Sequence, residues 1–156
     1  MFRHVSLDRT LRAALAAPAA QAVLFSTDAD GWAHGACWPL ALALKAWLTS
    51  VAPASSPQLA LVTSVRLMPT LDADLAPAAC VEHVVVRCRL GGVPYVCDGD
   101  GVAPEGGWLA RWSADESLDQ PAFAPYDRAT CRARELGWWG NALPARILAT
   151  LPLTVA

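Results

Sequence analysis

The stretch GWAHGACWPLALALKAWL, residues 31–48, decides how this chain is expected to fold. From Cys37 onward its apolar residues, among them Leu40 and Leu44, recur at the spacing of one helix face. Pro39 fits only in the first turn of a helix, where no intrahelical hydrogen bond needs its missing N–H. We therefore expect a helix that begins at or just after Cys37, ends near residue 50, and packs one apolar stripe against a core.

Cys37 is the first candidate for chemistry, because it lies where this helix begins. The unpaired N–H groups and the positive end of the helix dipole favour a thiolate over a thiol there. Gly31 and Gly35 allow the approaching backbone to turn sharply without covering the sulfur. A free cysteine is also often a small apolar residue buried in a core. The glycine-rich approach favours the other interpretation, in which Cys37 is presented as a nucleophile.

The strongest strand pattern lies further along, in VEHVVVRCRL (residues 81–90) and VPYVC (residues 93–97). Gly91 and Gly92 between them are typical of a two-residue hairpin turn. The sequence therefore predicts an antiparallel hairpin over residues 81–97.

His83 lies in this apolar strand pattern, where a buried imidazole needs polar partners. Counting outward from the two-residue turn, His83 faces Asp100, and Val85 faces Asp98. Because side chains alternate along a strand, His83, Asp98 and Asp100 then project from one face of the hairpin. Either carboxylate is placed to hold the ring through its Nδ1–H, and a single bulge would change which one does so. A strand histidine that only donates to a backbone carbonyl is the structural alternative.

A cysteine at a helix start, then a strand histidine, then a carboxylate on the next strand resembles the papain-like cysteine-enzyme superfamily. That group includes transglutaminase-like and arylamine N-acetyltransferase-like branches. The segment EHVVVRCRLGGVPYVCDGDG, residues 82–101, is similar to their histidine strand, hairpin and Tyr-x-x-Asp strand. The resemblance implies that Cys37 is the nucleophile, that His83 is the general base and acid, and that Asp98 orients His83. It also implies an α+β, papain-like fold with helices packed on an antiparallel β-sheet.

The activity that this triad implies is cysteine-dependent acyl-group chemistry: amide hydrolysis, deamidation or acyl transfer on a protein or peptide substrate. Papain-like proteases carry a glutamine before the cysteine, whereas residues 31–36 contain neither Gln nor Asn. The oxyanion hole is therefore expected to use the Cys37 backbone N–H and one further donor, either His34 or the Nε1 of Trp32. No cofactor is expected.

Two metal interpretations are weaker. His34, Cys37, His83 and Asp98 mix ligand types without a paired-ligand motif, so they do not favour a metal site. The DGDG stretch at residues 98–101 lacks the glutamate that an EF-hand needs at loop position twelve.

A non-catalytic protein-binding module on the same scaffold is the alternative function. Its contact surface would be the tryptophan-rich C-terminal third, which contains Trp108, Trp112, Trp138 and Trp139. Such tryptophans are more often packed in a core than used for stacking on bases.

Composition favours one domain over residues 1–156, with 54% hydrophobic and 17% charged residues. The formal net charge of −2 gives no general attraction to nucleic acid or to an anionic membrane. The five cysteines contain no Cys-x-x-Cys pair, so neither a disulfide framework nor a zinc ribbon is suggested. No signal peptide or membrane span is recognisable, so we expect a cytoplasmic protein, or one delivered by a signal-peptide-independent secretion system.

The remaining elements follow from local patterns. Residues 21–26 favour helix or loop, residues 69–79, with two prolines, are expected to form a surface loop, and residues 113–125 are polar and bounded by proline. The other predicted elements are a strand over 59–67 and helices over 6–17, 105–112, 127–136 and 142–151.

Overall fold

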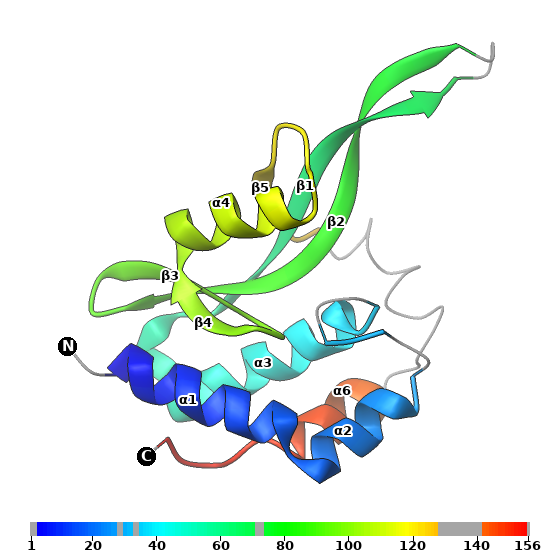
Figure 1. The fold of residues 1–156 in the computed structure, drawn as a ribbon. Helices are drawn as coiled ribbons and strands as arrows, with labels where there is room; N and C mark the ends of the chain where they lie inside the picture. Colours follow the sequence, from blue (N-terminus) through cyan, green and yellow to red (C-terminus); the bar gives the residue numbers. More distant parts are fainter. Residues whose placement is uncertain (1–2, 28–29, 33–34, 71–73, 128–141, 156) are drawn as a thin grey trace.

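The computed structural model describes the chain except for residues 1–2, 28–29, 33–34, 71–73, 128–141 and 156. Helices and strands combine into an α+β fold, as expected (Figure 1). In chain order the elements are α1 (Arg3–Ala16), α2 (Pro18–Phe25), α3 (Cys37–Val51), the 3-10 turn η1 (Pro53–Ser55), β1 (Gln58–Pro69), β2 (Leu75–Leu90), β3 (Val93–Asp98), β4 (Gly101–Pro104), α4 (Glu105–Asp115), β5 (Ala122–Pro125) and α6 (Ala142–Leu148).

The strands form one antiparallel sheet in the order β4-β3-β2-β1-β5. Helices α1, α2, α3 and α6 lie on one side of it and α4 lies on the other (Figure 1). Side chains alternate along β2, so this strand contributes to the apolar clusters on both faces of the sheet. Val84 and Val86 belong to the cluster under α1 and α3, whereas Val85 belongs to the cluster under α4. A strand that is buried on both faces explains the unbroken apolar run in β2.

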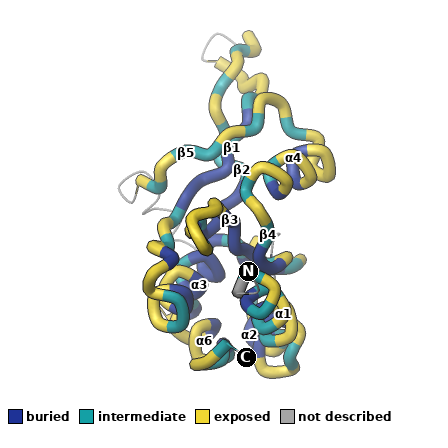
Figure 2. The backbone as a smooth tube through the Cα atoms, turned by 90° about the vertical axis from the view of Figure 1, so that its left-hand side faces the viewer, coloured by how far each residue is buried: buried dark blue, intermediate teal, exposed yellow. Residues whose placement is uncertain are grey.

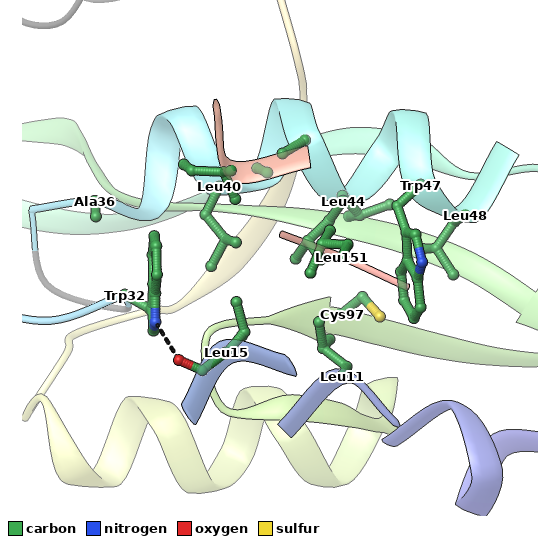
Figure 3. Close-up of a cluster of buried hydrophobic side chains, with 14 of the residues drawn as sticks. Leu11, Leu15, Trp32, Ala36, Leu40, Leu44, Trp47, Leu48, Cys97 and Leu151 are labelled. Atoms are coloured by element: carbon green, nitrogen blue, oxygen red, sulfur yellow. Dashed lines mark hydrogen bonds between the residues drawn. The ribbon is translucent and has the colours of Figure 1, made fainter. Parts of the chain in front are cut away.

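Helix α3 fits the expected pattern. It begins at Cys37, and its apolar stripe, including Leu40 and Leu44, is buried. Leu11 and Leu15 of α1 meet this stripe in the larger core cluster (Figure 3). This packing fixes the start of α3 against the sheet.

The central hairpin has the register that its turn predicts. Val86 faces Cys97 and Leu90 faces Val93, while Gly91 and Gly92 both adopt positive φ, which a type I′ turn requires. The pairing of β2 with β3 ends at Val86 and Cys97, however, because the chain turns after β3 into β4.

The predicted facing of His83 and Asp100 is therefore wrong. Asp98 pairs with Gly101 across the tight turn into β4, and His83 pairs with Val62 of β1. Gly101 of the DGDG stretch makes this second turn possible, since its φ is +112°.

The expected surface loop over residues 69–79 is also wrong. Strand β1 continues to Pro69 and β2 begins at Leu75, so the two form a long ribbon that extends beyond the rest of the sheet (Figure 1). The outer part of the ribbon is largely exposed (Figure 2). Its exposed residues include Leu67, Met68 and Leu75. Pro77 faces Leu67 and does not interrupt the ribbon.

The other expected elements have mixed outcomes. Helices near residues 6–17, 105–112 and 142–151 are present as α1, α4 and α6, residues 21–26 mostly belong to α2, and the strand over 59–67 is part of β1. Strands β4 and β5 were not predicted, and the expected helix over 127–136 lies outside the described residues. Within the described chain, no helix combines the length and apolar character needed to cross a membrane.

Candidate active site

Cys37 is the first residue of α3. The preceding residue, Ala36, makes no side-chain cap, and Gly35 reaches the helix with a φ of +89°. The first turn of the helix therefore offers its N–H groups without a capping oxygen from Ala36. The Cys37 side chain is only partly buried.

His83 is held at a distortion of the sheet. Val62 faces His83 while the next residue of β1, Thr63, faces Val81, so Glu82 is an extra residue in β2. A bulge of this kind bends the strand and redirects the side chain beside it. The Glu82 carboxylate is bound by the Ser64 hydroxyl and by the Arg66 guanidinium, which anchor the bulge to β1.

Two tryptophans of α4 cover the imidazole. The ring of His83 stacks on Trp112 with centroids 4.9 Å apart, and on Trp108 at 6.0 Å. The two indoles also stack on each other at 5.5 Å. His83 is 1% exposed, so this aromatic wall fixes its ring and removes it from water. The sequence contained a signal for this wall, since Trp108 and Trp112 are four residues apart on a predicted helix.

Asp98 is the buried carboxylate beside His83. Its Oδ1 accepts the backbone N–H of Asp100 at 3.0 Å, and its Oδ2 accepts the Nε1–H of Trp108 at 3.1 Å. Oδ2 also lies 3.4 Å from Nε2 of His83. Asp100 itself is exposed, so of the two candidate aspartates the structure brings Asp98 to the imidazole.

The contact between His83 and Asp98 differs from expectation in one respect. The ring nitrogen that faces the carboxylate is Nε2, not Nδ1. At 3.4 Å the contact is longer than a good hydrogen bond, and neither ring nitrogen has a hydrogen-bond partner of good geometry among the described residues. The pair is therefore an ion pair when His83 is protonated, rather than a formed hydrogen bond.

His83 and Cys37 shift each other's pKa in opposite directions. Burial lowers the pKa of His83, but Asp98 and Cys37 together outweigh it and raise that pKa to about 9. Burial raises the pKa of Cys37, but His83 and the backbone N–H groups of Val84 and Trp38 outweigh it, so the net direction is down. A thiolate beside an imidazolium is favoured at this site.

The buried cysteines elsewhere behave in the opposite way. Burial raises the pKa of Cys88 to about 11 and that of Cys97 well above its ordinary value. The pKa of Cys37 is lowered instead because His83 and nearby backbone N–H groups outweigh its burial. Cys131 lies outside the described residues.

The expected oxyanion donors are only partly located. The Nε1–H of Trp32 donates to the carbonyl of Leu15 at 3.3 Å, so the prediction that it serves the oxyanion is wrong (Figure 3). His34 lies outside the described residues. The backbone N–H groups of Val84 and Trp38 contribute to the lowered pKa of Cys37. The Trp38 N–H belongs to the helix start that the sequence predicted, whereas the Val84 N–H comes from a distant strand and was missed.

Within the described chain, no group of three or more His, Cys, Asp or Glu side chains has the arrangement of a metal site. Comparison with models of protein families, with curated proteins and with solved structures finds no match for this chain.

Proposed function

We propose that the protein is a cysteine-dependent enzyme of papain-like type, which uses Cys37, His83 and Asp98 for acyl-group chemistry. The observation that carries the proposal is the position of His83, a buried imidazole whose Nε2 lies 3.4 Å from a carboxylate of β3 and whose pKa is raised by that carboxylate and by the thiol of α3. Nucleophilic catalysis requires a thiol, a base within reach of it and a group that holds the base.

In the proposed reaction the Cys37 thiolate attacks the acyl carbon of an amide, and a C–S bond forms. Protonated His83 gives its proton to the departing amine as the C–N bond breaks, which leaves a thioester on Cys37. Neutral His83 then takes a proton from water or from an acceptor amine as it attacks the thioester, and the C–S bond breaks. The thiolate and the imidazolium are restored.

Asp98 and the two tryptophans act on His83. The carboxylate stabilises the imidazolium and orients the ring through Nε2, which leaves Nδ1 for the proton transfers. Trp108 in turn holds Asp98 through its Nε1–H. Hydrolysis, deamidation and acyl transfer all pass through the same thioester, and a protein or peptide is the proposed substrate.

The test of this proposal is formation of an acyl-enzyme from p-nitrophenyl acetate. We expect a burst of about one equivalent of p-nitrophenolate per protein, and a single acetyl group that peptide mass spectrometry assigns to Cys37. Cys37→Ser and His83→Gln should abolish the burst, whereas the matched control Cys80→Ser should keep it. Acetylation spread over several cysteines, or a full burst from His83→Gln, would contradict the proposal.

Two of the four tryptophans that the binding-module alternative needs on the surface are buried. Trp108 is 1% exposed and Trp112 is 7% exposed, because both pack around His83. The same acetylation test separates the two functions, since a binding module has no need of an activated thiol.

A further inference from the structure

One edge of β2 has no partner strand among the described residues. Strand β3 pairs with β2 only from Val86 to Leu90, and then turns away. On that side β2 continues to Leu75 with its backbone unpaired by any described strand, while its other side is paired with β1 along the same length. Unpaired edges of this length are templates for another extended chain.

Backbone alternation identifies which groups face this edge in the outer ribbon. The N–H of Val65 donates to the carbonyl of Asp119 at 3.0 Å, so the backbone of Val65 points away from β2. Its partner Ala79 must then point its own N–H and C=O away from β1, toward the open edge. Pro77 follows the same alternation, which explains why a residue without an N–H is tolerated there.

The other end of the edge lies at Cys37. Leu90 and Val93 flank a two-residue turn and form a hydrogen-bonded pair, so Val86 and Val84 also point toward the β3 side. Beyond the end of β3, no described strand pairs with the N–H of Val84, which instead contributes to the lowered pKa of Cys37. The open edge therefore begins at the candidate site, one residue from His83, whose Nε2 lies 3.4 Å from Oδ2 of Asp98.

Pro77 lacks an N–H that an added strand would use, but no charged side chain opposes pairing along the outer part of this edge. The segment LAPAACV, residues 75–81, has no charged residue, although exposed edges usually carry charges that prevent pairing. The outer part of this edge, residues 75–81, is therefore without charges, and beyond Glu82 and His83 the edge reaches the candidate site, so it is suited to hold an extended backbone.

We propose that the edge of β2 from Leu75 to Val84 is the substrate-binding site, and that an extended polypeptide pairs with it as an added strand that carries its acyl carbon to Cys37. This inference rests on the proposed function and names its substrate class. Backbone hydrogen bonds supply affinity for any extended sequence, and alternate side chains supply selectivity. At about 3.3 Å per residue, six residues reach from Cys37 to Ala79.

The probe is a pool of acetylated six-residue peptides with mixed side chains that end in a glycine chloromethyl ketone. Attack by Cys37 forms a C–S bond and releases chloride. Two further pools carry N-methyl groups on alternate amides, one pool for each of the two alternations. We expect one N-methylated pool to alkylate Cys37 about tenfold or more slowly than the parent pool, and the other to react as fast, because only one side of an added strand meets β2.

Two variants examine the protein side of the same contact. Ala79→Pro removes an N–H from the open edge and should slow the parent pool by about 3- to 10-fold. Leu67→Pro is the matched control, because Leu67 faces Pro77 and points its N–H to the opposite edge of the ribbon, so the rate should not change. Thermal melts establish that both variants fold, and the N-methylated pools test wild-type protein in any case.

Iodoacetamide, which needs no strand pairing, separates the two levels of failure. If it labels Cys37 no faster than the other cysteines, the proposed function itself is wrong. If it labels Cys37 rapidly but the two N-methylated pools react alike, the thiol is active and the proposed strand pairing is wrong. An equal effect of Ala79→Pro and Leu67→Pro would also overturn it.

Discussion

Replacement of Asp98 by asparagine tests the centre of the proposed site. The surroundings of His83 raise its pKa from 6.5 to about 9, which corresponds to about 3 kcal/mol in favour of the imidazolium. The contact with Asp98 makes the largest single contribution to raising this pKa, Cys37 makes the next, and burial acts in the opposite direction. In Asp98→Asn the charge is lost while the shape is kept, so the pKa of His83 should fall and a smaller fraction of His83 should be protonated at pH 7.

The loss should be visible at the thiol. Without an imidazolium beside it, Cys37 approaches an ordinary cysteine, which is about 3% thiolate at pH 7. We expect iodoacetamide to alkylate Cys37 of Asp98→Asn about tenfold more slowly than in wild type. The assay is alkylation at pH 7 followed by peptide mass spectrometry, with denatured protein as the control for a chemically free thiol.

Asp100→Asn provides the matched comparison. The Asp100 side chain is exposed, and its backbone N–H, which donates to Asp98, is unaffected by the substitution. Alkylation should proceed at the wild-type rate. An equal loss in both variants, or a wild-type rate in Asp98→Asn with its fold intact by circular dichroism, would refute the assigned role of Asp98.

Three further predictions concern pH and stability. The pKa of Cys37 is lowered and that of His83 is raised to about 9, so the alkylation rate of Cys37 should rise with pH in two steps. The first step should follow the lowered pKa of Cys37, below the usual thiol range, and the second should come near pH 9, where His83 loses its proton; a single step near pH 8.5 would contradict this. Gly101→Ala should lower the free energy of unfolding by about 2 kcal/mol in denaturant titrations, because Gly101 has a φ of +112° and a Cβ there would overlap Asp8. An unchanged unfolding midpoint would count against the described turn. Glu105→Gln should lower the free energy of unfolding by less than about 1 kcal/mol in the same assay, since the bidentate pair of Glu105 with Arg87 is partly exposed to solvent. A larger decrease would show that the pair is more than a surface contact.

Local rules were sufficient for the parts of the fold in which one interaction dominates. Pro39 and the apolar stripe located the start of α3, and Gly91 with Gly92 determined the register of the central hairpin. The register of this hairpin could be predicted from the turn alone, without distant parts of the chain, because a two-residue turn leaves little choice of pairing.

The errors arose where long-range pairing overrides local preference. Pro69 and Pro77 are loop formers by local rules, but Pro69 ends β1 and Pro77 stands at a position that needs no ladder N–H. The bulge at Glu82 depends on Ser64 and Arg66 of another strand, so no pattern within β2 reveals it. The orientation of the His83 ring depends on this bulge and on α4, which explains why the wrong ring nitrogen was expected to face Asp98.

The hydrogen bond from the N–H of Val102 to Asp8 joins residues 94 positions apart, at 2.8 Å. It ties α1 to the strand that follows Asp98, so docking of the first helix adds to the hold that Trp108 and the Asp100 N–H have on this carboxylate. A contact of such sequence separation forms only once the intervening chain has been made and its loop has closed. A chain still emerging from the ribosome would therefore carry an ordinary thiol at Cys37, and the thiol would acquire its lowered pKa only after the sheet and the first helix have assembled.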